Sequence, residues 1–345
     1  MVTRRVNGAR FAAIRLRPAS DLYPRCGRIV RSHRDPQRLW AIISIRESDL
    51  GVTNMSDNEA TTQSTLMKGK RGLVLGIATE RSIAYGIAQV LSAQGAELAV
   101  TYQVDQLASR VTSLAQGLGA SIIQPADVQN PEHLDQLFTT IAKQWGGLDF
   151  IVHSIAFSDR KELEGAYANT TRANFLNTMD ISCYSFTDLA RRSAAMMPNG
   201  GSMLTLTYLG GERVLPHYNV MGVAKAALEA SVRYLAADFG TRKIRVNAIS
   251  AGPVKTLAAS GISDFRFIMR WNEINAPLRR NITTIEAGNA ALFLLSDLGT
   301  GVTGETVYVD AGYHILGMMS VEGAPEVADL LNHMKAERKE RLSKK

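Results

Sequence analysis

Two side chains able to handle protons, a tyrosine and a lysine, stand seven residues apart in the stretch YNVMGVAKAALEA (218–230). On an α-helix seven residues turn through about 700° and advance about 10 Å, so Tyr218 and Lys225 would share one face. A phenol on that face could donate a hydrogen bond to a developing oxyanion, and an ammonium could bind hydroxyl groups. An amphipathic helix with one buried phenol and one surface amine would look the same, so the rest of the chain must decide.

The elements around this helix alternate between short apolar runs and helical stretches from Lys70 onward, which predicts βαβ units. We expect strands at 71–77, 96–102, 120–127, 148–155, 201–207, 244–250 and 306–310. We expect helices at 82–95, 105–118, 131–145, 216–239 and 284–297, with two more within 170–197. The predicted fold class is α/β: a single doubly wound Rossmann-type domain, with a seven-stranded parallel sheet and helices on both faces.

The first strand–turn–helix, LGIATERSIAYG (75–86), has the features of a dinucleotide-binding turn without the common GxGxxG pattern. Gly76 ends the strand, Ser82 begins the helix and Gly86 lies one turn inside it. These positions supply a tight turn, exposed N–H groups for a pyrophosphate and a small residue where helix meets sheet. An ordinary βα turn remains the alternative.

Residues after the next strands could contact the rest of a dinucleotide. Gln103 follows the second strand, where an acid often bonds the adenosine ribose. Its uncharged amide would not repel a 2′-phosphate, but it offers no cation to attract one. Asp127 and Val128 follow the third strand and could enclose an adenine, although Asp127 could equally be a helix N-cap. HSIAF (153–157) follows the fourth strand, where ligands of such sheets bind.

Composition limits the classes of protein that fit. The chain has 345 residues, 46% of them hydrophobic, which is ample for a core. No run approaches about 18 uninterrupted apolar residues, so we expect no membrane span. Cys26 and Cys183 are too far apart to suggest a disulfide framework, which favours a reducing, cytoplasmic location. CxxC pairs, HExxH and clustered histidines are absent from the sequence, so we predict no metal site.

The net charge of +7 comes from the N-terminal leader. Residues 1–54 contain eleven arginines, no lysine and four acids, and the remainder is formally neutral. We therefore expect no nucleic-acid binding by the body of the chain. Residues 1–66 are interpreted as a disordered extension or a stretch upstream of a true start at Met55 or Met67, with a transit peptide as the alternative.

Six segments together resemble the short-chain dehydrogenase/reductases and, within them, the bacterial NADH-dependent enoyl-acyl carrier protein reductases of type II fatty acid synthesis. The segments are GIATERSIAYGIAQ, ELAVTYQ, VHSIAF, LTLTYLGGER, YNVMGVAKAALEA and RVNAISAGPVKTLAASGI. The resemblance covers about residues 67–320. Ordinary members carry Y-x3-K, which no tyrosine in this chain satisfies; Tyr218 and Lys225 form the Y-x6-K of the enoyl reductase branch.

The resemblance implies a set of site residues. Cofactor contacts for NADH would be Gly76, Ser82, Ile83, Gln103, Asp127, Val128, Ile155 and Lys225, with the strip Val254, Lys255, Thr256, Leu257 and Ala258 closing over the nicotinamide. Tyr208, Tyr218 and Lys225 would be catalytic, and Ser158, Tyr208 and Tyr218 would bind substrate. The substrate would be enoyl-acyl carrier protein, and a homotetramer is implied by resemblance alone.

This resemblance supplies a reason for the spacing. In enoyl reduction hydride reaches the β-carbon, and negative charge develops on an oxygen three bonds away. The phenol must therefore stand further from the nicotinamide than in ketone reduction, while Lys225 stays at the ribose. We also expect the charge of Lys225 to lower the pKa of Tyr218. The rival activities are reduction of ketones or 3-oxoacyl thioesters, and a non-catalytic dinucleotide sensor.

Two segments near the C-terminus complete the prediction. Residues 254–271 resemble a lid over the acyl chain, with a surface helix as the alternative. Arg266 and Arg270 on it could meet an acidic carrier protein. Residues 321–345 form a charged tail, interpreted as a solvated helix end.

Overall fold

The structure is a computed structural model that describes residues 65–257, 259 and 265–343. The expected N-terminal extension therefore lies outside the described residues apart from its last two positions. Ala258 and the centre of the expected lid are outside them as well.

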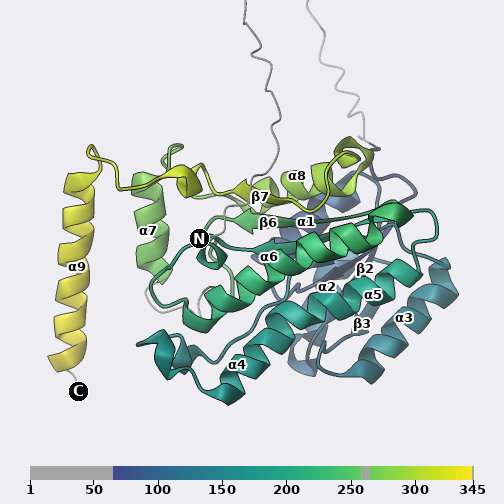
Figure 1. The fold of residues 1–345 in the computed structure, drawn as a ribbon, viewed down its shortest axis with the longest axis horizontal. Helices are drawn as coiled ribbons and strands as arrows, with labels where there is room; N and C mark the ends of the chain where they lie inside the picture. The colour runs from purple at the N-terminus through teal and green to yellow at the C-terminus, as the bar shows by residue number, and fades with distance from the viewer. Residues whose placement is uncertain (1–64, 258, 260–264, 344–345) are drawn as a thin grey trace, which may run out of the picture. The chain divides into compact units, whose positions relative to one another are not determined.

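The described chain alternates strands and helices along its length (Figure 1). The strands are β1 Arg71–Leu75, β2 Glu97–Tyr102, β3 Ile122–Pro125, β4 Phe150–His153, β5 Gly201–Thr207, β6 Ile244–Ala251 and β7 Thr306–Val309. The helices are α1 Ile83–Ala93, α2 Asp105–Gly117, α3 Pro131–Trp145, α4 Arg172–Met179, α5 Ser185–Ala195, α6 Asn219–Phe239, α7 Phe265–Asn275, α8 Thr284–Leu295 and α9 Ala324–Ser343. A π-helical segment, Asp180–Tyr184, joins α4 to α5.

The strands form one seven-stranded sheet in the order β3-β2-β1-β4-β5-β6-β7, and every pairing is parallel. The prediction of a doubly wound parallel sheet is confirmed. The chain leaves β1 for β2 on one side and later returns to place β4 on the other. This reversal creates a switch point between β1 and β4, where such sheets bind ligands beyond their carboxyl ends.

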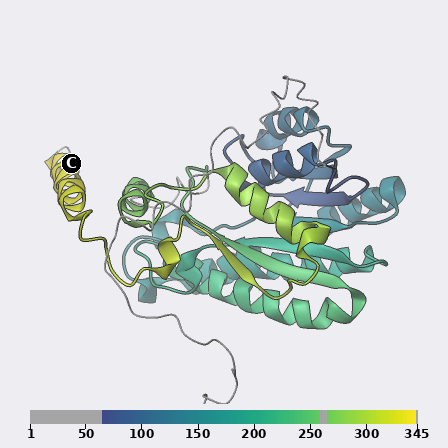
Figure 2. The same cartoon turned by 90° about the horizontal axis from the view of Figure 1, so that it is seen from above.

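Side chains from both faces of the sheet form the core, because successive residues of a strand point to opposite sides. Leu73 and Leu75 pack in one buried cluster with residues of α3, α5 and α6. Val74 packs in a second cluster with residues of α1, α2 and α8. Helices therefore cover both faces, as Figure 2 shows from above.

Local sequence explains where the helices begin. The side chain of Asn130 accepts hydrogen bonds from the backbone N–H groups of Glu132 and His133, and proline follows at the first helical position of α3. A capping box between Thr283 and Glu286 begins α8. Caps of this kind satisfy backbone N–H groups that have no partner within the helix.

Helices α7 and α9 lie side by side beyond the end of the sheet (Figure 1). Val327 of α9 is buried, and a Cβ on Gly323 would come within 2.6 Å of Ile274 of α7. Arg270 of α7 bridges to Glu326 of α9 at 3.0 Å. The charged tail thus contains a helix that packs on α7, the helix that includes the last residues of the expected lid.

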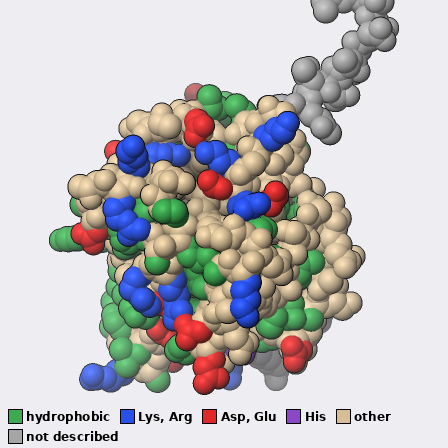
Figure 3. Space-filling view, turned by 90° about the vertical axis from the view of Figure 1, so that its right-hand side faces the viewer, with side chains coloured by type: hydrophobic (Ala, Val, Ile, Leu, Met, Phe, Trp, Pro, Cys, Tyr) green, Lys and Arg blue, Asp and Glu red, His purple; other side chains and the backbone are tan. Residues whose placement is uncertain are grey.

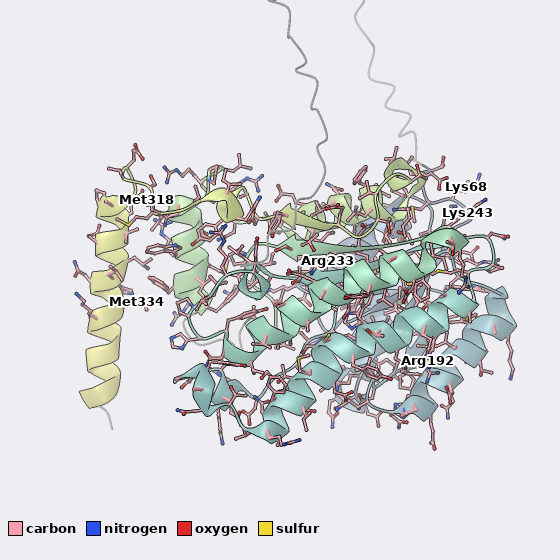
Figure 4. All side chains as sticks on the ribbon, viewed as in Figure 1. Lys68, Arg192, Arg233, Lys243, Met318 and Met334 are labelled. Atoms are coloured by element: carbon pink, nitrogen blue, oxygen red, sulfur yellow. The ribbon has the colours of Figure 1, made fainter. Side chains whose placement is uncertain are left out.

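The two ends of the sheet differ in their surroundings. Lys68 and Lys243, which precede β1 and β6, lie at one end of the molecule in Figure 4, and Met318, which follows β7, lies at the other. The face at the amino ends of the strands mixes Lys and Arg with Asp and Glu and shows no continuous basic surface (Figure 3). Within the described residues, no helix has the length and apolar character needed to cross a membrane.

Candidate active site

Lys225 lies inside the molecule on α6, with only 6% of its surface exposed. Its Nζ donates a hydrogen bond of 2.7 Å to the carbonyl oxygen of Leu206, near the end of β5. Burial lowers the pKa of Lys225 to about 8, because an ammonium loses hydration there. The ammonium therefore lies at the carboxyl edge of the sheet and loses its proton at a lower pH than an exposed lysine does.

The two tyrosines named from the sequence are neighbours. Their rings meet edge to face, with centroids 5.3 Å apart and an angle of 75° between the planes. Tyr208 follows β5 directly, and Tyr218 immediately precedes α6. Tyr218 is 7% exposed and packs with Leu163, Val220 and Met221.

The pKa of Tyr218 is raised rather than lowered as expected, and Lys225 is not among the groups that shift it. Burial raises the pKa of the Tyr218 phenol well above its usual range, because the phenolate would lose its hydration, and Tyr208 and Glu229 raise it further. Burial raises the pKa of Tyr208 as well. In this structure both phenols are therefore neutral hydrogen-bond donors at neutral pH rather than acids ready to ionise.

Neither phenol hydroxyl bonds to another group within the described part of the chain. Among the described residues, neither hydroxyl oxygen is one of the fully buried polar atoms that lack a partner, so both are accessible to solvent and to a ligand. Tyr208 and Tyr218 present two such hydroxyls in one place. The pair can bind an oxygen atom that carries developing negative charge.

The turn after β1 fits a dinucleotide. Gly76 has φ of 101°, and a Cβ there would come within 2.0 Å of the carbonyl oxygen of Ser154, so only glycine fits this close approach of β1 and β4. The Ser82 hydroxyl oxygen accepts hydrogen bonds of 3.0 Å from the N–H groups of Ala78 and Thr79. The turn thus delivers the N-terminus of α1, with Ile83 as its first residue, to the switch point.

Gln103 and Asp127 stand after neighbouring strands, as expected. Gln103 is exposed just beyond β2. The Asp127 carboxylate accepts from the N–H of Gln129 at 3.1 Å, in a turn of its own. The alternative reading of Asp127 as a helix N-cap is wrong, because Asn130 caps α3.

The remaining predicted contacts are distributed around the same edge. Val128 and Ile155 are partly buried against the cluster of α3, α5 and α6. The hydroxyl of Ser158 accepts from Thr178 at 2.9 Å and from the amide of Asn174 at 3.1 Å, so it is directed toward α4. In the strip that the resemblance places over the nicotinamide, Val254 packs on the core and Thr256 is half-buried. Lys255 and Leu257 are exposed, and Ala258 lies outside the described residues.

A partly buried polar pair on the end of β5 and on α6 was missed from the sequence. The Thr207 hydroxyl donates a 2.6 Å hydrogen bond to Glu229, which lies one turn beyond Lys225 on α6. Burial raises the pKa of Glu229. The spacing of four between Lys225 and Glu229 could have indicated a shared helix face.

His153 was also missed, at the end of β4. Its Nε2 lies 2.9 Å from the Ser185 hydroxyl and its Nδ1 lies 2.8 Å from that of Thr205. Because Ser185 donates its own proton to the carbonyl of Ile181, Nε2 carries the imidazole proton and Nδ1 accepts. Burial lowers the pKa of His153 to about 3, so the ring is a neutral link between β4, β5 and α5. A histidine inside an apolar strand run was the available signal.

Together these features define a class of protein. A doubly wound parallel sheet, a glycine turn at its switch point and a tyrosine–lysine helix beside it are typical of the short-chain dehydrogenase/reductases. A family profile described as "Enoyl-(Acyl carrier protein) reductase" matches residues 76–314. The chain belongs to this family.

Individual relatives agree. "Enoyl-[acyl-carrier-protein] reductase [NADH] 1" of Rhizobium meliloti is 60% identical over 267 residues, which are 77% of this chain and 98% of the relative. The crystal structure of the Anaplasma phagocytophilum reductase in complex with NAD is 58% identical, with a TM-score of 0.73 over 75% of this chain and 98% of that one. The Bacillus cereus reductase with NADP+ and an indole naphthyridinone is 51% identical, with a TM-score of 0.72 over 74% and 100%.

Proposed function

We propose that this protein reduces the trans-2 double bond of enoyl-acyl carrier protein thioesters with NADH in fatty acid elongation. The observation that carries the proposal is the pair of neighbouring phenols, together with Lys225, whose Nζ bonds to the Leu206 carbonyl two residues before Tyr208. Family membership supports the same reaction. The enzyme is an enoyl-[acyl-carrier-protein] reductase, an oxidoreductase acting on CH–CH bonds.

In this mechanism the protein groups bind and stabilise charge. NADH, when bound, supplies the hydride for the β-carbon of the enoyl group. The Tyr218 hydroxyl donates a hydrogen bond to the thioester oxygen as that oxygen becomes an enolate, which stabilises charge that is absent from the bound substrate. The enolate then takes a proton from solvent at its α-carbon, which gives the saturated thioester. Tyr208 supplies a second donor or a wall of the pocket. Lys225, near the Leu206 carbonyl, is the residue that would hold the ribose hydroxyls.

The function is tested by adding a crotonyl thioester to the purified protein with NADH. We expect NADH consumption that depends on the thioester, and formation of the saturated butyryl thioester. Consumption with an acetoacetyl thioester or a ketone, but not with crotonyl thioester, would instead support a 3-oxoacyl or ketone reductase. Binding of NADH without turnover of any of these would support a dinucleotide sensor.

NADH is expected to be preferred over NADPH. Gln103 lies exposed after β2, and no arginine or lysine occurs within five residues of it to pair with a 2′-phosphate. Because a desolvated phosphate without a cationic partner binds poorly, kcat/KM with NADPH should be lower by about tenfold or more. Equal kcat/KM for both cofactors would contradict this, and the NADP+ complex of the Bacillus cereus relative makes the comparison necessary.

The proposed carrier surface lies on α7. Arg270 is engaged by Glu273 at 3.1 Å and Glu326 at 3.0 Å, so its charge is already countered within the chain. Arg266 is exposed one turn earlier. Of the two arginines, we therefore assign Arg266 to the contact with an acidic acyl carrier protein.

We also propose that the enzyme is a cytoplasmic homotetramer. Large apolar side chains are exposed along α4, its π-helical continuation and α6, including Leu176, Tyr184 at 59% and Tyr234 at 76%. Apolar groups gathered on adjoining helices favour burial against another subunit. Neither membrane nor nucleic acid is proposed as a partner.

A further inference from the structure

Tyr218 stands in an unusual stretch of backbone. The residues on either side of it have positive φ angles, 57° at His217 and 36° at Asn219, although neither is glycine. Such a conformation is strained for a residue with a side chain, and asparagine tolerates it better than most residues do. The N–H of Met221 bonds to the Tyr218 carbonyl at 2.9 Å, and Asn219, the last residue of this turn, is also the first residue of α6. The phenol therefore projects from a left-handed turn rather than from a regular helix.

The side chain of Asn219 holds the turn against a distant segment. Its Nδ2 lies 3.1 Å from the carbonyl oxygen of Leu163, 3.3 Å from that of Gly165 and 3.4 Å from that of Glu162. An amide nitrogen has two hydrogens, so these three acceptors share two donors. The segment 162–165 is itself anchored, because the Glu162 carboxylate accepts from both the N–H and the hydroxyl of Thr171 at the start of α4.

Glycines close the other side of the Tyr218 ring. A Cβ on Gly210 would come within 2.3 Å of the Tyr218 ring atom Cδ1. A Cβ on Gly222 would come within 2.6 Å of the Gly210 carbonyl, so the turn at 209–211 and α6 are in close contact. The Tyr208 ring lies across the edge. The Tyr218 ring therefore packs against Gly210 and against the Tyr208 ring.

We propose that Asn219 is a positioning residue for Tyr218: by binding the carbonyl groups of residues 162–165, its amide maintains the left-handed turn that sets the place of the phenol. The proposal rests on the proposed function for its kinetic readout, because the phenol is then the donor to the enolate. Its structural content, the placement of the Tyr218 ring, can be measured without turnover.

The test compares three substitutions. Asn219→Asp keeps the size and the tolerance for positive φ but loses the donor, and places a carboxylate against carbonyl oxygens. Asn219→Gly removes the backbone strain as well as the donor, and Asn219→Ala keeps the strain. Asn289→Asp, an exposed position on α8, is the matched control for the chemical change.

We expect Asn219→Asp to lower kcat by about 10- to 100-fold, the range seen for small displacements of reacting groups, with the Kd for NADH unchanged. The double variant with Tyr218→Phe should lose no more than Tyr218→Phe alone, because the amide acts through the phenol. The proposal would be overturned if the double variant lost as much kcat as the product of the two single losses. It would also be overturned if Asn219→Gly and Asn219→Asp kept the kcat of the unaltered enzyme.

Placement is read separately with 3-fluorotyrosine, in which the fluorine resonance missing from Tyr218→Phe identifies Tyr218. We expect this resonance to shift or broaden in Asn219→Asp and to stay in place in Asn289→Asp. An unmoved resonance would overturn the proposal even if the enzyme proved to reduce another substrate. An inactive wild-type protein with a moved resonance would count against the proposed function alone.

Discussion

Tyr218→Phe is expected to lower kcat by roughly 10²–10³-fold and to leave the Kd for NADH unchanged. The substitution removes one hydroxyl that bonds to no other described group of the protein, so the fold loses no internal hydrogen bond. What it removes is a donor to charge that develops only in the transition state, and such a loss affects kcat rather than cofactor binding. Stopped-flow turnover of a crotonyl thioester and NADH fluorescence titration measure the two quantities.

Two further phenols make this result specific. Tyr208→Phe tests the neighbouring ring, and Tyr234→Phe is the matched control, because that phenol is 76% exposed on the same helix as Lys225. We expect a smaller loss from Tyr208→Phe and none from Tyr234→Phe. If Tyr208→Phe caused the larger fall in kcat, the donor would be Tyr208, and the seven-residue spacing would serve only to place Lys225.

Replacing Lys225 should affect binding and rate together. Lys225→Met fills a similar volume without the charge. We expect the Kd for NADH to rise by about 10- to 100-fold, because hydrogen bonds to a charged group contribute a free energy of that order, and we expect kcat to fall. Lys143→Met, at an exposed position of α3, is the control. An unchanged Kd would show that Lys225 does not hold the ribose.

The pH dependence of NADH binding tests the same residue. Burial lowers the pKa of Lys225 to about 8, so the ammonium is present below that pH and is lost as the pH rises through it. The Kd for NADH should therefore increase between about pH 7 and pH 9, by severalfold if the neutral amine still bonds to the ribose. The same titration of Lys225→Met should lack this increase, and a rise of equal size there would assign the pH dependence to another group.

Local pattern was sufficient for the fold class and indicated the helix that carries the proposed Lys225. Alternating apolar runs and helices predicted seven parallel strands, and the structure contains them in one sheet. Hydrophobic periodicity and residue spacing depend only on residues close together in the sequence. They therefore also predicted that Tyr218 and Lys225 lie on or next to one helix. Element ends were less accurate: β4 covers Phe150–His153 within an expected 148–155, because capping and pairing set the boundaries.

By itself the sequence determined the fold class and indicated Gly76, Tyr218 and Lys225 as candidates for the site; the tertiary structure decided the surroundings of those groups. The raised pKa of Tyr218 depends on burial, which no spacing reports, and it reversed the expectation drawn from the charge of Lys225. Arg270 bonds to Glu326, which lies 56 residues later in the sequence. Asn219 bonds to the carbonyl of Leu163, which lies 56 residues earlier. Desolvation and long-range contacts arise only when distant segments pack, so the electrostatics and the alignment of this site belong to the folded chain.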